Sequence, residues 1–138
     1  MNTEADFEPG QIYNRRQDIH GKYGGQRQGG ISTPAQFPVV LIFTGESGEE
    51  YGYHDEYRNG HFFYTGEGQT GDMKMLRGNR AIRDHVRDGK TLHLFKYVKP
   101  GLVRYIGEAE YQGHSEKQRP DKDGKNRQVI VFDLSVED

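Results

Sequence analysis

The sequence contains no cysteine. This absence excludes a disulfide framework and any metal site built on thiolates, and it is typical of a chain that works inside the cell. The first ten residues, MNTEADFEPG, are acidic and lack the apolar core of a secretory signal peptide. No apolar run approaches the roughly 20 residues that cross a bilayer as a helix. We therefore expect a cytoplasmic protein that makes no membrane contact.

The sequence also lacks a recognisable catalytic centre. Its six histidines include no pair at the spacing of a helical zinc site, and Ser47 lacks the strand-to-helix context of a hydrolase nucleophile. Gly66, Gly68 and Gly71 match the spacing of a dinucleotide-binding loop, but the helix that should open within such a loop is expected only near Asn79. These absences favour a binding module, without cofactor or metal, over an enzyme.

Hydrophobic residues are scarce, at 32% of the chain, and charged residues make up 29%. This composition predicts a thin core under a large wetted surface, and a length of 138 residues most simply forms one domain. We expect residues 1–8 to be a flexible tail and residues 9–138 to be the folded domain.

The formal net charge is −2, so the chain as a whole does not favour nucleic acid. Its basic residues nevertheless gather in three groups, and two of them lie in polar segments, residues 14–33 and 114–127, that we expect to be loops. Such loops are either mobile surface or contacts for a phosphate backbone. The second interpretation assigns DNA-backbone contacts to Arg15, Arg16, Lys22, Gln26, Arg27, Gln28, Lys117, Arg119 and Arg127.

Short runs of β-branched and aromatic residues predict strands at residues 10–13, 38–44, 61–65, 91–98, 102–111 and 128–136. Several strands with a single helix predict an α+β domain with a curved sheet or barrel. The helix is expected over residues 78–89, with Asn79 as its cap, Gly89 at its end, and an apolar stripe made of Ala81, Ile82, His85 and Val86.

The stretch from residue 50 to residue 73 is the richest in aromatic residues, acids and glycines. Two tyrosine faces can stack on a flat polar ring, and Asp55 or Glu56 can accept a hydrogen bond from an exocyclic amine of that ring. On this interpretation the tyrosines are pocket walls and not core residues. The alternative is an ordinary hairpin whose tyrosines are half-buried in a sheet.

These residues resemble the SRA (SET- and RING-associated, or YDG) domain family. Tyr53 to Glu56 is similar to the family's GYxDD segment, and Phe62 to Gly68 is similar to its strand and YTGxG segment. Gln26 to Ile31 resembles its first DNA-contacting loop, and Gly78 to Ile82 resembles the start of its helix. Arg104 to Gly107 stands where the family has RYDG, with Ile106 in place of the aspartate.

The resemblance covers roughly residues 9–134 and is closest to the bacterial SRA-like domains of McrA-type modification-dependent restriction proteins, which are coupled to HNH nucleases. It implies a PUA-like, curved β-barrel with one main helix that flips a modified cytosine out of duplex DNA. The segment between Gly68 and Gly78 is shorter than the finger that eukaryotic members insert into the duplex. The implied site comprises Tyr53 and Tyr64 as stacking residues, Asp55 or Glu56 as the acceptor, and Thr65 and Gly66 as backbone contacts to the base edge.

The implied function is that of a nucleoid-associated, non-catalytic reader of 5-methylcytosine, tolerant of 5-hydroxymethylcytosine, in bacterial restriction–modification. Its partner is methylated duplex DNA, with an HNH nuclease as a further partner or fused domain. The alternatives are an RNA-binding PUA-like module and the DNA-recognition part of a modification-dependent restriction endonuclease. Burial of one methyl group contributes only about 0.8 kcal/mol, so we expect a modest preference over plain cytosine.

Overall fold

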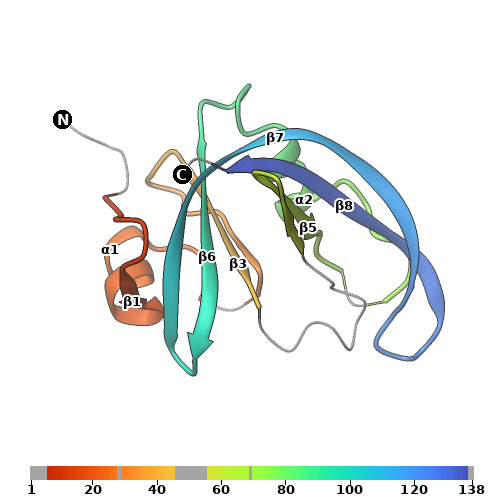
Figure 1. Cartoon of the computed structure of the whole chain (residues 1–138), viewed down its shortest axis with the longest axis horizontal. Helices are drawn as coiled ribbons and strands as arrows, with labels where there is room; N and C mark the ends of the chain where they lie inside the picture. The colour runs from red at the N-terminus through yellow and green to blue at the C-terminus, as the bar shows by residue number, and fades with distance from the viewer. Residues whose placement is uncertain (1–5, 28, 46–55, 69, 137–138) are drawn as a thin grey trace.

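The fold is organised around one curved, mixed β-sheet (Figure 1). The computed structural model describes residues 6–27, 29–45, 56–68 and 70–136. Along the sheet the strand order is β2-β3-β6-β7-β8-β5-β4, and β1 pairs with β7. The strands are β1 (Ile12–Asn14), β2 (Ile31–Ser32), β3 (Val39–Thr44), β4 (Glu56–Arg58), β5 (His61–Thr65), β6 (Thr91–Lys99), β7 (Leu102–Pro120) and β8 (Asn126–Val136).

The expected α+β class with a curved sheet is confirmed, but the sheet does not close into a barrel. Among the described residues, the pairings leave β2 and β4 at opposite ends of the strand order. All neighbouring strands are antiparallel except β3 and β6, which are parallel. No helix in the described part of the chain is long and apolar enough to cross a membrane.

Strand β3 is buried along its whole length because apolar side chains cover both of its faces. Val40 and Ile42 point into one core cluster, together with Phe132 from β8. Leu41 and Phe43 point into a second cluster, on the other face of the strand. Side chains alternate between the two faces of a strand, so a strand with a core on each side needs an unbroken apolar run. This requirement explains why the sequence here reads PVVLIFT without alternation.

The first polar segment, which we expected to be a loop, contains helical structure. It forms the π-helix η1 (Arg15–His20) and the short helix α1 (Gly21–Tyr23). Asn14 caps η1 by accepting a hydrogen bond from the Gln17 amide, 2.9 Å away. Ile19 and Tyr23 anchor the segment, since both are buried.

The main helix is shorter than the sequence predicts. Helix α2 spans Arg77–Arg83, and the residues that follow form turns, so Val86 is 62% exposed instead of facing the core. Leu76, not Asn79, occupies the N-cap position. Asn79 lies inside the first turn and is 1% exposed.

The second polar segment is a β-hairpin and not the expected loop. Strand β7 continues to Pro120 and pairs with β8 from Asn126 onward, and Figure 1 shows the two strands arching together to a turn beyond the sheet. We call this extension, residues 113–133, the arm. At its tip Asp121 accepts hydrogen bonds from the amides of Asp123 and Lys125, at 2.9 and 3.0 Å. Backbone hydrogen bonding, chiefly from Lys125, holds the pKa of the Asp121 carboxyl below its usual value.

Phe7, which we assigned to the tail, lies within a cluster of aromatic rings. Its ring centroid is 4.9 Å from that of Phe95, 5.2 Å from that of Tyr105 and 5.3 Å from that of His93. His93 is 4% exposed, and its Nδ1 lies 2.8 Å from the Tyr105 hydroxyl. Burial lowers the pKa of His93 from 6.5 to about 4, because the charged imidazolium is poorly solvated there.

This histidine makes the folded state sensitive to acid. The unfolded chain takes up a proton near pH 6.5, whereas folded His93 stays neutral down to about pH 4. Its contribution to stability is therefore complete above pH 6.5 and is lost as the pH falls toward 4. We expect the free energy of unfolding to fall by roughly 2 kcal/mol between pH 7 and pH 5 from this residue. Urea titrations at the two pH values measure this loss; His93→Phe should remove most of it, and an equal loss in that variant would contradict the assignment.

Candidate nucleic-acid interface

Tyr64 is a core residue, contrary to the expected pocket wall outside the core. It is 4% exposed and belongs to the same cluster as Ile42 and Val131. Its hydroxyl donates a hydrogen bond to the Phe43 carbonyl oxygen, 3.4 Å away. The burial follows from the sheet, since alternate residues of β5 face the core and Tyr64 faces the same way as Phe62. Tyr53 and Asp55 lie outside the described residues, as does the side chain of Glu56.

The first polar segment meets β5 at the tip of Tyr64. A Cβ atom on Gly30 would lie 2.3 Å from the Tyr64 hydroxyl oxygen, so only glycine allows the chain to pass here. The Gly30 carbonyl accepts a hydrogen bond from the Phe43 amide at 2.7 Å, which fixes this approach. The first polar segment and Tyr64, which are far apart in the sequence, are thus in direct contact.

Asn79 fixes the backbone that follows β5. Its Oδ1 accepts a hydrogen bond from the Glu67 amide at 2.8 Å, and its Nδ2 donates to the carbonyl oxygens of Glu67 and Lys74, both at 3.0 Å. A Cβ atom on Gly66 would lie 2.5 Å from Asn79 Oδ1. The backbone at Glu67 is therefore held by a buried side chain. The backbone at Thr65 and Gly66, expected to contact a base edge, is held by β8, since Thr65 pairs with Val131 and the Gly66 amide donates to the Ile130 carbonyl at 2.8 Å.

Glu67 completes this contact by capping α2. Its Oε2 accepts a hydrogen bond from the Gly78 amide at 3.0 Å, where a carboxylate is favoured by the helix dipole. A Cβ atom on Gly78 would lie 2.8 Å from that oxygen, so a larger residue here would displace the Glu67 carboxylate. We call residues 66–79 the connector. The roles of Glu67 and Asn79 are not evident from the sequence, because these two contacting residues are separated by about a dozen positions.

The connector is also bonded to the arm. The Met73 amide donates to the Gln128 carbonyl at 2.9 Å, and the Gln128 amide donates to Asp72 Oδ1 at 2.7 Å. Arg127 Nη1 donates to the Gly71 carbonyl at 2.9 Å. The connector therefore follows the edge of β8 and joins the end of β5, the arm and α2 into one unit. Arg127, a predicted phosphate contact, is 4% exposed and directed inward.

Comparison with known proteins decides the family. The model of the ScoMcrA-like SRA domain matches residues 9–137. The chain belongs to this family. The resemblance seen in the sequence is thereby confirmed. None of the curated proteins compared with this SRA domain matches it.

Solved structures support the same fold. A structure of the sulfur binding domain and SRA domain of ScoMcrA complexed with phosphorothioated DNA has a TM-score of 0.74 and 23% identity, covering 94% of this chain and 39% of that one. The SUVH5 SRA domain with hemi-methylated CG DNA has a TM-score of 0.70 and 19% identity over 96% and 90%. The DNA recognition domain of the cytosine modification-dependent restriction endonuclease LpnPI has a TM-score of 0.71 and 16% identity over 97% and 75%. The SRA domain thus spans less than half of the ScoMcrA chain.

One departure from the family pattern is explained by packing. Ile106, which replaces the aspartate of YDG, is half-buried against the larger core cluster. Its neighbour Tyr105 is 3% exposed and is bonded to His93 instead of the solvent. The segment therefore has an apolar, structural role in this SRA domain.

Two of the predicted backbone-contact residues in the first segment hold the segment together. Arg15 is 7% exposed; its Nε donates to His20 Nε2 at 2.9 Å, and its guanidinium lies 3.7 Å from the centroid of the Phe43 ring. Gln26 Oε1 accepts a hydrogen bond from the Thr33 amide at 2.7 Å. Gln28 lies outside the described residues and Arg119 is half-buried, whereas exposed positions are occupied by Arg16, Lys22, Arg27 and Lys117.

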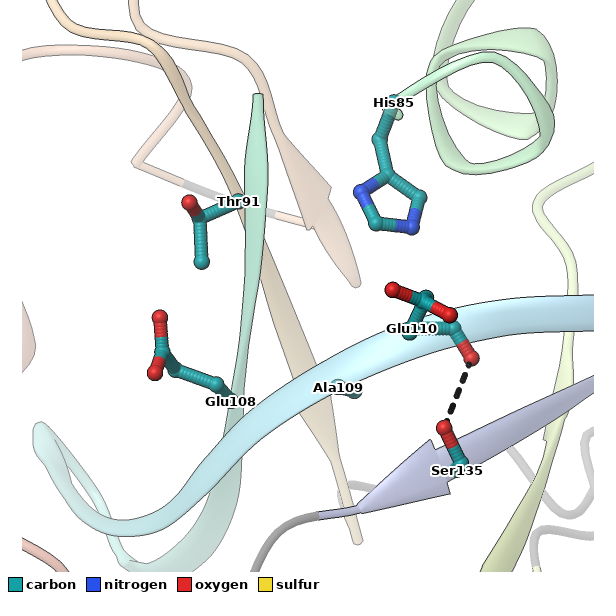
Figure 2. Close-up of a pocket in the computed structure, with 6 residues that line it drawn as sticks. All are labelled: His85, Thr91, Glu108, Ala109, Glu110 and Ser135. Carbon is teal, nitrogen blue, oxygen red and sulfur yellow. Dashed lines mark hydrogen bonds between the residues drawn. The ribbon is translucent and has the colours of Figure 1, made fainter. Parts of the chain in front are cut away.

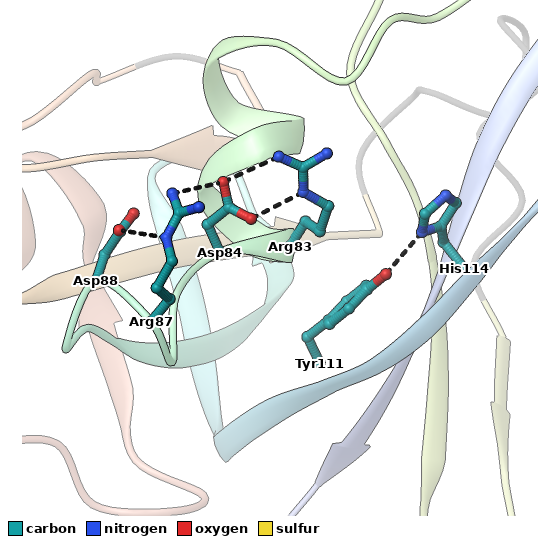
Figure 3. Close-up of polar contacts among 6 residues, drawn as sticks. All are labelled: Arg83, Asp84, Arg87, Asp88, Tyr111 and His114. Atoms are coloured by element: carbon teal, nitrogen blue, oxygen red, sulfur yellow. Dashed lines mark hydrogen bonds and ion pairs between the residues drawn. The ribbon is translucent and has the colours of Figure 1, made fainter.

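The cations in and beside α2 fall into two kinds, and Figure 3 shows the two that contact Asp84. Asp84 accepts hydrogen bonds from Arg83 at 2.8 and 3.1 Å and from Arg87 at 3.0 Å, so these two arginines are engaged within the domain. Hydrogen bonding from Arg83 lowers the pKa of the Asp84 carboxyl. Lys74, Arg77 and Arg80 are exposed and form no ion pair with any described residue.

A surface hollow of about 400 Å³ has two carboxylates in its lining (Figure 2). Glu108 and Glu110 line it, and two carboxylates disfavour a phosphate backbone. The ring of His85 is committed there, since its Nδ1 donates to the Lys90 carbonyl at 2.8 Å and its Nε2 accepts from the Tyr111 amide at 3.1 Å. No cluster of three or more metal-ligating side chains occurs within the described ranges.

The hydrogen bonds of Asn79 to the backbone of Glu67 and Lys74 yield a stability prediction. Asn79→Ala removes three hydrogen bonds and leaves buried backbone groups without partners, so we expect a loss of about 2–4 kcal/mol in the free energy of unfolding. Urea unfolding measures this loss. Asn126→Ala, at an exposed position in the arm, is the matched control and should change stability by less than about 0.5 kcal/mol. Equal unfolding midpoints for the two variants would contradict the role of Asn79.

Proposed function

We propose that this SRA domain binds duplex DNA carrying a modified cytosine and holds that base, flipped out of the helix, at the end of β5. The observation that carries the proposal is membership of the SRA family over nearly the whole length of the chain, together with the backbone at Glu67, just after β5, that Asn79 holds in place. SRA domains of the same fold have been solved with methylated DNA. A backbone that is already held in place contacts a ligand without a further ordering cost.

The energetics of flipping fit the residues available. Extrusion of a base from the stack costs a few kcal/mol. Stacking on an aromatic ring returns about 1–3 kcal/mol per contact, so stacking on Tyr53 offsets much of the cost. Asp55, or Glu56 one residue later, accepts the hydrogen bond of the cytosine amine. The methyl group adds only about 0.8 kcal/mol, so the preference for 5-methylcytosine is modest and 5-hydroxymethylcytosine is tolerated.

The biological setting follows from the family. We infer that the domain is the recognition part of a bacterial modification-dependent restriction system, with nuclease activity supplied by another domain or protein. Relatives of known structure support this inference, since LpnPI and ScoMcrA are described as modification-dependent restriction endonucleases. In ScoMcrA a sulfur binding domain is named beside the SRA domain, so sulfur in the backbone is treated as a separate modification.

A mobility-shift series tests the function. The duplexes carry cytosine, 5-methylcytosine, 5-hydroxymethylcytosine or a phosphorothioate at one position, and a structured RNA represents the alternative of an RNA-binding module. We expect the tightest binding to one of the duplexes with a modified cytosine. Equal affinity for all duplexes, or preference for the RNA, would overturn the proposal, and preference for the phosphorothioate would reassign the modification.

Substitutions in the proposed pocket locate the base. Tyr53→Ala should lower specific affinity by about 1–3 kcal/mol. Asp55→Ala should cost as much or more, because it leaves the amine without an acceptor, and Asp55→Asn should cost less. For Tyr64→Ala the unfolding curve must be measured together with the affinity, since truncation of a buried aromatic residue costs about 3–5 kcal/mol of stability. Unchanged preference for methylated DNA in both Tyr53→Ala and Asp55→Ala would exclude this pocket; a silent Asp55→Ala with a harmful Glu56→Ala would shift the register by one residue.

Exposed cations should supply the part of the affinity that does not depend on modification. We expect Arg27→Glu and Lys117→Glu to weaken binding to modified and unmodified duplexes alike and to flatten the salt dependence. Titrations at several salt concentrations measure both effects. Lys99→Glu, at an exposed position at the end of β6, is the charge-matched control. If Arg27→Glu removed only the preference for modified cytosine, its assignment to the phosphate backbone would be wrong.

A further inference from the structure

We propose that Arg15 is a positioning residue for DNA binding: it does not touch the duplex, but it holds the part of the first polar segment that presents Arg27 to a phosphate. This inference rests on the proposed function, in which Arg27 contacts the DNA backbone. Arg15 thereby has a different role from the direct phosphate contact that the basic pattern of the sequence assigns to it, and its effect on the duplex passes through Arg27.

The side chain of Arg15 is buried among partners within the domain. It is 7% exposed, and its guanidinium lies 3.7 Å from the centroid of the Phe43 ring. Its Nε donates to His20 Nε2 at 2.9 Å, and its Nη2 donates to the Gln26 carbonyl oxygen at 3.3 Å. A guanidinium is planar and carries its donors in a rigid fork, so it can stack on a ring and join two chain segments at once. Arg15 therefore connects the start of the first polar segment with the residue that precedes Arg27.

His20 extends this connection to the turn that leads to Arg27. Its ring is 3% exposed, and its Nδ1 donates to the Gly24 carbonyl oxygen at 2.8 Å, which leaves Nε2 as the acceptor for Arg15. Burial lowers the pKa of His20, so the ring is neutral at pH 7 and able to accept this hydrogen bond. The positive charges of Arg15 and Arg27 lower the same pKa further, which indicates that the Arg27 cation lies near this pair.

Gln26 is held on its other side by Thr33. Its Oε1 accepts a hydrogen bond from the Thr33 amide at 2.7 Å, and its Nε2 donates to the Thr33 hydroxyl at 3.2 Å. Arg15 thus fixes the backbone of Gln26, and Thr33 fixes its side chain. Arg27 is the next residue and is exposed. A cation that extends from a fixed backbone loses less conformational freedom when it binds a phosphate, so Arg15 contributes to an affinity that Arg27 delivers.

Phe43, on which Arg15 stacks, joins this arrangement to the proposed base site. Its amide donates to the Gly30 carbonyl at 2.7 Å, and its carbonyl accepts from the Tyr64 hydroxyl at 3.4 Å. The first polar segment is therefore tied to β5 as well as to η1. Phosphate contacts set the register of a protein on a duplex, so a phosphate contact held in this way keeps a fixed relation to the end of β5.

A double-mutant cycle tests whether Arg15 acts through Arg27. The affinities of the unaltered protein, Arg15→Gln, Arg27→Gln and the double variant are measured for a duplex with one 5-methylcytosine and for its unmodified counterpart, at several salt concentrations. We expect Arg27→Gln to weaken binding roughly tenfold in the unaltered protein and less than about threefold in the Arg15→Gln background. Arg15→Gln alone should lower the salt slope by about one phosphate contact. An equal effect of Arg27→Gln in both backgrounds would overturn the inference.

Two further variants separate position from charge. Arg15→Lys keeps the positive charge without the fork and should behave like Arg15→Gln; if it binds like the unaltered protein, Arg15 supplies charge and not position, and the inference is wrong. Arg16→Gln removes the same charge from the adjacent, exposed residue of η1. Its effect should add to that of Arg27→Gln, because the cycle then contains two independent contacts.

A measurement on the unaltered protein keeps the inference testable if substitution of the buried Arg15 prevents folding, which thermal melts would show. We expect backbone 15N order parameters of about 0.85 for residues 24–27 in the absence of DNA, and values below about 0.6 would overturn the inference. Failure of the proposed function is seen separately: equal affinity of the unaltered protein for the two duplexes removes the preference for modified cytosine, while the cycle on the unmodified duplex still decides the role of Arg15. If Arg27→Gln has no effect on the unaltered protein, the phosphate contact is wrong and the inference fails with it.

Discussion

The hydrogen bonds of Asn79 to the backbone of Glu67 and Lys74 are the interaction on which the rest of the candidate interface depends. One buried amide joins the backbone after β5 to the turn before α2, through Glu67 on one side and Lys74 on the other. Gly66 and Gly78 leave the space that this contact needs, since a Cβ on either would collide with Asn79 or Glu67. A small, low-hydrophobicity domain thereby gains a rigid surface segment without enlarging its core.

The arrangement separates stability from recognition among residues of similar chemistry. Arg15 and Arg127 are arginines in basic segments, yet both are buried and bonded to backbone or ring partners within the domain. Arg83 and Arg87 are held by Asp84. The cations that remain exposed include Arg27 in the first segment, Lys74 in the connector and Lys117 in the arm. This distribution supports the proposed phosphate contacts of a chain whose net charge is −2.

Local patterns predicted the parts of the fold that depend on neighbouring residues. Strands β3, β5 and β6 are evident in the sequence as apolar runs, because each covers one or two core faces along its length. The arm was missed because its paired strands are polar on their exposed surfaces, and its pairing is not local. The turn residues after Asp121 were an available signal for the hairpin of the arm. Asn59–Gly60 was the corresponding signal for the hairpin of β4 and β5, since both are typical of hairpin connections. The inward direction of Arg127 and the role of Asn79 depend on partners distant in the chain, which periodicity does not reveal.

The central claim, that a modified cytosine leaves the duplex and lies against the end of β5, is tested most directly by the base itself. A duplex carrying one 5-methylcytosine with a 13C-labelled methyl group allows that methyl to be followed by NMR in the complex. The account predicts a changed methyl shift caused by the neighbouring Tyr53 ring, with nuclear Overhauser contacts from the methyl group to that ring. A methyl resonance that keeps its shift and its contacts to the adjacent stacked bases in the saturated complex would contradict the account.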